Sequence, residues 1–352
     1  MIVFRIVQGA AAGVITPLLA TIMLEAAHGQ SLGKLMATAG LPVVVVPIFG
    51  PVIAGLILNN LDWRWIFYIN VPIVIIGIAL AWWKLPKDEP AVTRHRFDGL
   101  GFLQLAPAIA LIFYGLSQAD GSSGFGSENA WLPLVVGLVL TGCFVVYSLG
   151  KQNPLIDIRA LRVRSYAMSL SILFLSGLSV YGPLLLISLF YQQVQHQSVL
   201  ATGLLLAPQG IGALLSRVSA GKLVDKIGAR PVIIGGLLLT ALGTLPFAFV
   251  TAHTTEWVLA VALFVRGLGL TPITIATMVG TFQGLPKEAI ANGSSTVRVI
   301  QQVGGSFGTA VLTVILTRAM LTSSLSAGAF NVAFWWSIGF VVLALVPTLL
   351  LP

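Results

Sequence analysis

The sequence has 352 residues, of which 57% are hydrophobic and only 9% are charged, and its mean hydropathy is +0.97. Soluble domains carry about 25% charged residues, so this composition excludes an ordinary soluble protein. The net charge of +8 does not indicate nucleic-acid binding, because the basic residues form short clusters between apolar runs. We therefore expect an all-α, polytopic membrane protein.

A helix needs about 20 apolar residues to cross a bilayer, because lipid offers backbone groups no hydrogen-bond partner. The sequence contains eleven such runs, and each is predicted to be a membrane-spanning helix. In chain order they are residues 2–24, 35–58, 65–83, 99–117, 131–150, 166–191, 201–219, 231–251, 257–280, 293–316 and 331–351.

The basic residues of the loops indicate how these helices are oriented. Fourteen of the 19 Lys and Arg residues fall in alternate loops, whereas the other set of loops contains only Arg64 and Arg318. Cytoplasmic loops are enriched in Lys and Arg, so the basic set is predicted to face the cytoplasm. The N-terminus is then predicted outside and the C-terminus in the cytoplasm.

Two of the predicted helices share a pattern that indicates an internal repeat. The runs 4–21 and 264–277 both place an arginine early, then glycines, then Thr-Pro and an Ala-Thr pair. Three predicted helices precede this pattern in the second copy and none precedes it in the first. Because many secondary transporters consist of repeated halves, we expect about ninety residues, with three helices, to be missing before Met1.

The repeat and the helix count divide the chain into three predicted parts. Residues 1–84 would be the remainder of an N-terminal half, with three helices. Residues 85–165 would hold two extra central helices with basic cytoplasmic loops, and residues 166–352 would form a complete C-terminal half of six helices.

Four short motifs occur in a fixed order along the chain. They are Arg5-Ile-Val-Gln8-Gly9 with Gly13 and Pro17; Pro47-Ile-Phe-Gly50-Pro51-Val-Ile-Ala54-Gly55; Trp63-Arg64-Trp65-Ile-Phe67-Tyr-Ile-Asn70-Val-Pro72; and Gly221-Lys-Leu-Val-Asp225-Lys-Ile-Gly228-Ala-Arg230.

Together these motifs resemble those of the major facilitator superfamily, in particular its fourteen-helix group of drug:proton antiporters. The resemblance implies the major facilitator helical fold, with eleven of fourteen helices present, in the bacterial inner membrane. It also implies export of amphipathic small molecules, coupled to proton influx by alternating access and without a cofactor. A periplasmic adaptor and an outer-membrane channel complete the route in some relatives, and the sequence leaves that possibility open here.

The resemblance also suggests roles for particular residues. Arg5 and Arg266 are candidates for proton coupling; the alternative is that both side chains reach the outer membrane interface. Residues 47–55 would form a hinge associated with export, and residues 221–230 a cytoplasmic gating loop. The corresponding site residues are, for the antiporter motif, Pro47, Gly50, Pro51, Ala54 and Gly55; for the gating loop, Gly221, Asp225, Gly228 and Arg230; and, as candidates for lining the cavity, Gln8, Thr16 and Gln209.

None of the 11 acidic residues lies in the middle of a predicted helix. A proton antiporter usually needs a carboxylate within its cavity. Two alternatives therefore stand beside an exporter: a non-transporting remnant (or mis-assigned start) of such a protein, and a membrane protein that binds or senses a ligand without transport. An enzyme is not expected, because the sequence contains no nucleophile–base pair, metal cluster or phosphate-binding loop.

Overall fold

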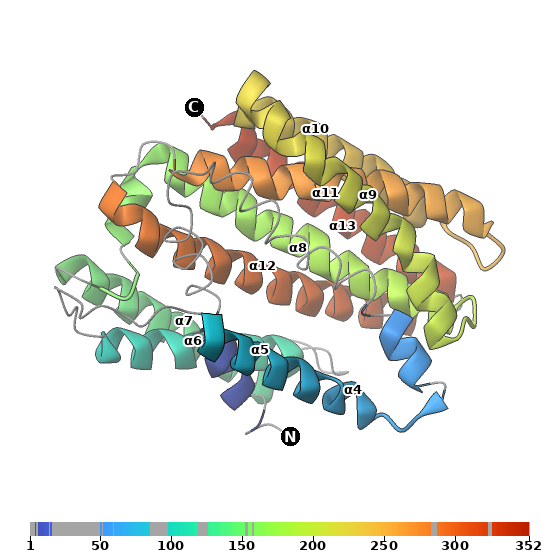
Figure 1. The fold of residues 1–352 in the computed structure, drawn as a ribbon, viewed down its shortest axis with the longest axis horizontal. Helices are drawn as coiled ribbons and strands as arrows, with labels where there is room; N and C mark the ends of the chain where they lie inside the picture. Colours follow the sequence, from blue (N-terminus) through green and yellow to red (C-terminus); the bar gives the residue numbers. More distant parts are fainter. Residues whose placement is uncertain are drawn as a thin grey trace.

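The computed structural model describes residues 4, 6–13, 15, 50, 52–58, 60–84, 98–118, 126–151, 154–156, 158–282, 287–322 and 326–351. Long helices dominate these residues (Figure 1). In chain order they are α4 (Trp65–Tyr68), α5 (Asn70–Lys84), α6 (Gly99–Gln118), α7 (Glu128–Gly150), α8 (Arg164–Gln193), α9 (Val199–Ile227), α10 (Ala229–Thr244), α11 (Glu256–Phe282), α12 (Lys287–Thr322) and α13 (Ser326–Leu349), with short 3-10 helices η2 (Ile158–Arg162) and η3 (Leu245–Phe249).

Nine helices in the described part of the chain are long and apolar enough to cross a membrane. They match nine of the eleven predicted runs, which confirms the all-α membrane fold. The helix around residue 65 is broken after Tyr68, and the run predicted at 231–251 ends as η3. The first two predicted runs, 2–24 and 35–58, lie largely outside the described residues; positions 4, 6–13, 15, 50 and 52–58 are helical.

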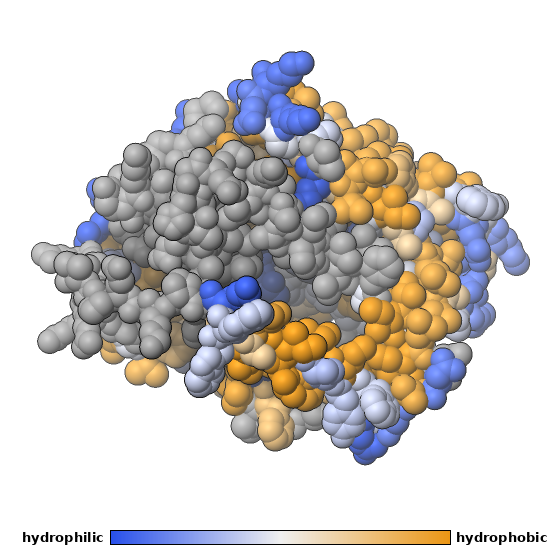
Figure 2. Space-filling model, in the orientation of Figure 1, coloured by the Kyte–Doolittle hydropathy of each residue, from blue (hydrophilic) through white to orange (hydrophobic). Residues whose placement is uncertain are grey.

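Helices α8 to α13 form a bundle in which α8 lies between α12 and the α9–α11 group (Figure 1). Within it α8 packs on α12 and α13, while α11 packs on α9 and α10. Helices α6 and α7 form a separate hairpin whose main contact with the bundle is made by α6 on α12. Apolar residues cover much of the described surface in Figure 2, as lipid contact requires.

Glycines bring α8 and α12 into direct backbone contact. A Cβ atom placed on Gly304 would lie 2.2 Å from the carbonyl oxygen of Phe174, and one on Gly308 would lie 2.5 Å from the Cα of Leu178. Gly177 of α8 faces α12 in the same way. In lipid, helices associate through such close packing because the hydrophobic effect does not drive them together there.

A second set of glycines joins α11 to its two neighbours. A Cβ on Gly267 would lie 2.0 Å from the carbonyl oxygen of Gln209 in α9, and one on Gly269 would lie 2.4 Å from that of Gly236 in α10. Helix α11 is therefore held between α9 and α10 at backbone distance, which fixes the position of the arginine that precedes Gly267.

We expect Gly304→Ala to destabilise the bundle by about 1–3 kcal/mol, because the added methyl group overlaps the backbone of α8. Gly339→Ala in α13 is the matched control, since a Cβ there meets no atom within 4 Å. Thermal unfolding of the purified protein in detergent checks both variants. Equal unfolding temperatures for the two would contradict the packing described here.

Candidate functional site

Arg266 lies at the centre of the C-terminal bundle and is completely buried. Its Nη1 donates to Oε1 of Gln209 in α9 at 2.6 Å, and its Nη2 donates to the carbonyl oxygen of Ser179 in α8 at 2.6 Å. The same Nη2 lies 3.4 Å from the carbonyl oxygen of Val180. The side chain thus joins three helices inside the bundle, where none of its surface is exposed.

The partners of Arg266 are all neutral oxygen atoms. Within the part of the chain that the structure describes, no acidic side chain forms an ion pair with it. A buried cation in a membrane helix is costly, and such residues usually pair with each other or with backbone carbonyls. Arg266 pairs with backbone carbonyls and with the amide oxygen of Gln209.

The other candidates for proton coupling and cavity lining have different environments. Gln209 is half-buried and is the hydrogen-bond partner of Arg266, so the structure brings these two predicted residues together. Gln8 is helical and exposed. Arg5 and Thr16 lie outside the described residues, and their predicted roles remain predictions.

The antiporter-like motif is described at Gly50, Ala54 and Gly55. Gly55 is buried, and a Cβ on it would lie 2.5 Å from the Cα of Leu200, near the start of α9. The helical segment 52–58 therefore meets the C-terminal bundle at the start of α9, as the blue segment beside α9 shows in Figure 1. Pro47 and Pro51 lie outside the described residues.

The predicted gating loop at 221–230 is not a loop in the structure. Helix α9 continues through Gly221 and Asp225 to Ile227, and α10 begins at Ala229. The single connecting residue is Gly228, with φ of 85°, a conformation that glycine adopts without strain. The apolar run predicted a helix end near residue 219, but the polar residues that follow continue the same helix to Ile227.

The charged residues of this segment lie at the surface. Asp225 and Arg230 are both exposed, and Asp225 has no ion pair with a described residue. In the structure the motif supplies a sharp turn between α9 and α10, and its role in gating stays a prediction.

Sequence reasoning missed a buried cluster at the start of α6. The carboxylate of Asp98, which is 4% exposed, accepts four hydrogen bonds. The donors are the backbone N–H groups of Gly101 and Leu155, the Tyr147 hydroxyl at 2.9 Å and the Lys151 ammonium at 2.7 Å. These groups connect the start of α6 to the end of α7 and to the segment that leads into α8.

The protonation of this cluster follows from its contacts. Burial alone would raise the pKa of the Asp98 carboxyl, but the four donors outweigh burial and hold that pKa well below its usual range. The hydrogen bond to Asp98 in turn raises the pKa of Lys151. The sequence signal was available, since an aspartate directly before an apolar run is a typical helix N-cap.

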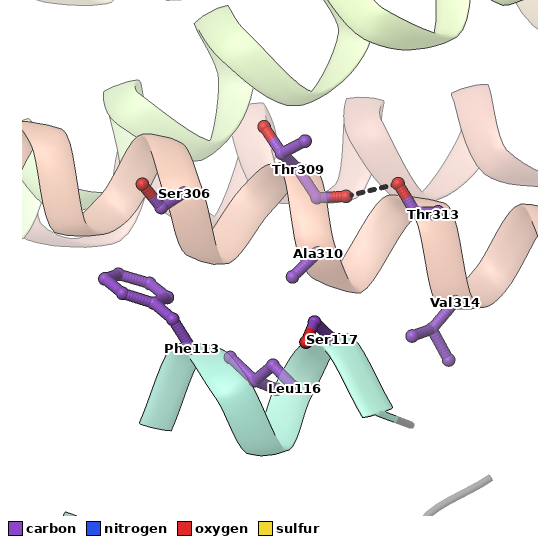
Figure 3. Close-up of a pocket in the computed structure, with 8 residues that line it drawn as sticks. All are labelled: Phe113, Leu116, Ser117, Ser306, Thr309, Ala310, Thr313 and Val314. Carbon is purple, nitrogen blue, oxygen red and sulfur yellow. Dashed lines mark hydrogen bonds between the residues drawn. The ribbon is translucent and has the colours of Figure 1, made fainter. Parts of the chain in front are cut away.

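A pocket of about 540 Å³ opens between α6 and α12 (Figure 3). Its walls are mainly apolar, and two of its hydroxyl groups donate within α12: Thr309 to the carbonyl of Gly305 and Thr313 to that of Thr309. These oxygen atoms can therefore still accept a hydrogen bond. The lining residues are Phe113, Leu116, Ser117, Ser306, Thr309, Ala310, Thr313 and Val314.

The apolar helices and loop charges define a multi-pass membrane protein. Comparison with known proteins then gives its family: a family model described as Major Facilitator Superfamily matches residues 1–309. The chain belongs to the major facilitator superfamily, and its relatives place it in the bacterial inner membrane.

Three relatives show where in the family the chain lies. It is 34% identical to the Multidrug resistance protein B homolog of Mycobacterium tuberculosis over 95% of this chain and 62% of the relative. It is 30% identical to the Multidrug export protein EmrB of Haemophilus influenzae over 89% of this chain and 62% of the relative. It is 26% identical to the Lincomycin resistance protein LmrB of Listeria monocytogenes over 90% of this chain and 67% of the relative. The chain thus spans about 62% of the length of the first of these.

We expect Asp98→Asn to lower the unfolding temperature by several degrees, because the ammonium of Lys151 loses its buried carboxylate. The exposed pair formed by Arg64 and Asp62 gives the matched control, and Asp62→Asn should have little effect. Thermal unfolding in detergent provides the measurement, and equal shifts in the two variants would contradict this assignment.

The stabilisation by Asp98 should be constant between pH 5 and 8. A depressed folded pKa means that the contribution is fully present above the unfolded carboxyl value of about 3.9 and is lost as the pH falls through the folded value. The difference in unfolding temperature between the native protein and Asp98→Asn, measured across this pH range, tests the sign. A difference that shrinks between pH 8 and 5 would contradict it.

Proposed function

We propose that this chain works in a secondary active exporter of amphipathic small molecules, driven by proton influx through alternating access. The observation that carries the proposal is its similarity, over 89–95% of its length, to proteins named for multidrug resistance and multidrug export. The antiporter-like motif and the arginine-containing repeat support the same conclusion.

The contact between Gly55 and Leu200 supports a role for the antiporter-like segment in alternating access. It joins the remainder of the N-terminal half to the C-terminal bundle at backbone distance. Rocking of one half against the other would have to change this contact, because interfaces between packed helices switch between discrete arrangements.

The pocket between α6 and α12 is the proposed contact site for the substrate. Its volume of about 540 Å³ falls within the range of drug-sized sites, roughly 300–1,000 Å³. Its apolar walls suit an amphipathic molecule, and the hydroxyl oxygens of Thr309 and Thr313 can accept a hydrogen bond from its polar or cationic end.

Export can be tested with inverted membrane vesicles that contain the full chain and a cationic fluorescent dye. Dye should accumulate only when a proton gradient is present, and a protonophore should abolish the uptake. Uptake that survives collapse of the gradient would contradict proton coupling, while no uptake at all would contradict export.

A membrane protein that binds ligands without transport is the second candidate. The absence of acidic side chains from the middle of every described span favours it, because proton coupling usually needs an intramembrane carboxylate. Saturable dye binding in vesicles that show no dye uptake would support this candidate instead.

We expect Ala310→Phe to weaken dye binding by roughly tenfold, equivalent to about 1.4 kcal/mol, because the ring fills the pocket between α6 and α12. Val342→Phe, which adds a similar ring to the exposed face of α13, should leave binding unchanged. Dye titration by fluorescence polarisation measures both. Unchanged affinity in a folded Ala310→Phe protein would place the substrate elsewhere.

A further inference from the structure

Helix α8 contains a buried proline at residue 183. Proline has no N–H group, so it cannot donate to the carbonyl four residues earlier, and that carbonyl belongs to Ser179. In lipid such a group must find another partner. The partner is Nη2 of Arg266, at 2.6 Å from the Ser179 oxygen. The guanidinium therefore satisfies the carbonyl freed by the proline, while its own Nε remains without a hydrogen-bond partner among the described residues.

We propose that Arg266 is a positioning residue that clamps α8 to α9 and α11 at the proline break. The clamp is the set of contacts from the guanidinium to Ser179 on α8 and to Gln209 on α9. It differs from the proton-coupling role that the family resemblance implies for this arginine, and it does not rest on transport by the chain.

The chemistry of the site fits a clamp better than a proton relay. Gln209 and the backbone carbonyls do not titrate, and no described acidic side chain pairs with Arg266. A guanidinium has donors in a fixed, planar fork, which can hold acceptors on two different helices at once. A lysine ammonium has no such geometry.

The surrounding helices fix the arginine from the backbone side as well. A Cβ on Gly243 of α10 would lie 2.4 Å from the backbone nitrogen of Arg266, and Gly267 contacts the backbone of Gln209. On the far side of α8, Gly182 lies against Gly308 of α12. The break at Pro183 is thus held between α12 on one side and the clamp on the other.

Hydrogen–deuterium exchange of the full chain in lipid nanodiscs tests the clamp without any need for transport. Arg266→Met should raise the exchange rate of the α8 amides around residues 180–190 by roughly tenfold, the effect of losing a hydrogen bond to a charged group. Arg266→Lys should have a smaller effect of the same sign.

The decisive comparison is made in a Pro183→Ala background. Alanine restores the N–H donor to Ser179, so Arg266→Met should then change the exchange of α8 by less than about twofold. Pro347 of α13 is the matched control, because no described side chain donates to the carbonyl of Leu343, four residues before it. In Pro347→Ala the roughly tenfold effect of Arg266→Met should persist.

Two results would overturn the clamp: an effect of Arg266→Met that is the same with and without Pro183, or no effect on α8 in either background. If Arg266→Met alone does not fold but folds in the Pro183→Ala background, the clamp is supported. If it folds in neither background, Arg266→Lys replaces Arg266→Met in the same pair of exchange measurements. Dye uptake by the native chain is measured separately, and its absence would contradict the proposed export alone.

Discussion

A helix that crosses lipid must satisfy its backbone polar groups within the protein, and the arrangement of the C-terminal bundle depends on this constraint. Pro183 breaks the hydrogen-bond ladder of α8 in the interior of the bundle, where water is excluded. The guanidinium of Arg266 supplies the missing donor, and the carbonyl supplies one of the acceptors that the buried charge requires. A proline that leaves a carbonyl unpaired and a buried guanidinium would each destabilise the bundle alone. The hydrogen bond between Arg266 and Ser179 offsets both costs.

Close packing makes that meeting possible. Gly267 lets α11 approach α9, and Gly243 lets α10 approach α11. The backbone of Arg266 therefore lies where α9, α10 and α11 are in close contact. Gly304 and Gly308 hold α12 against the opposite face of α8. The small residues thus determine the distances between helices, and the polar contacts are made at those distances.

The sequence predicted the spans well because about twenty apolar residues suffice to identify a membrane helix. It was wrong about the 221–230 segment, because the change from apolar to polar residues does not coincide with the end of α9. It identified Arg266 and Gln209 as unusual, yet it could not pair them, because they lie 57 residues apart. Asp98 lies in the region where the sequence predicted basic cytoplasmic loops, whereas tertiary contacts from Tyr147 and Lys151 bury it.

The order of α8, α9 and α11 along the chain has a consequence for biogenesis. A lone arginine at the centre of a helix opposes insertion by roughly 2.5–3.5 kcal/mol. Ser179 and Gln209 are both synthesised before Arg266 emerges from the ribosome. Insertion of α11 can therefore use hydrogen-bond acceptors on two helices that the ribosome has already produced.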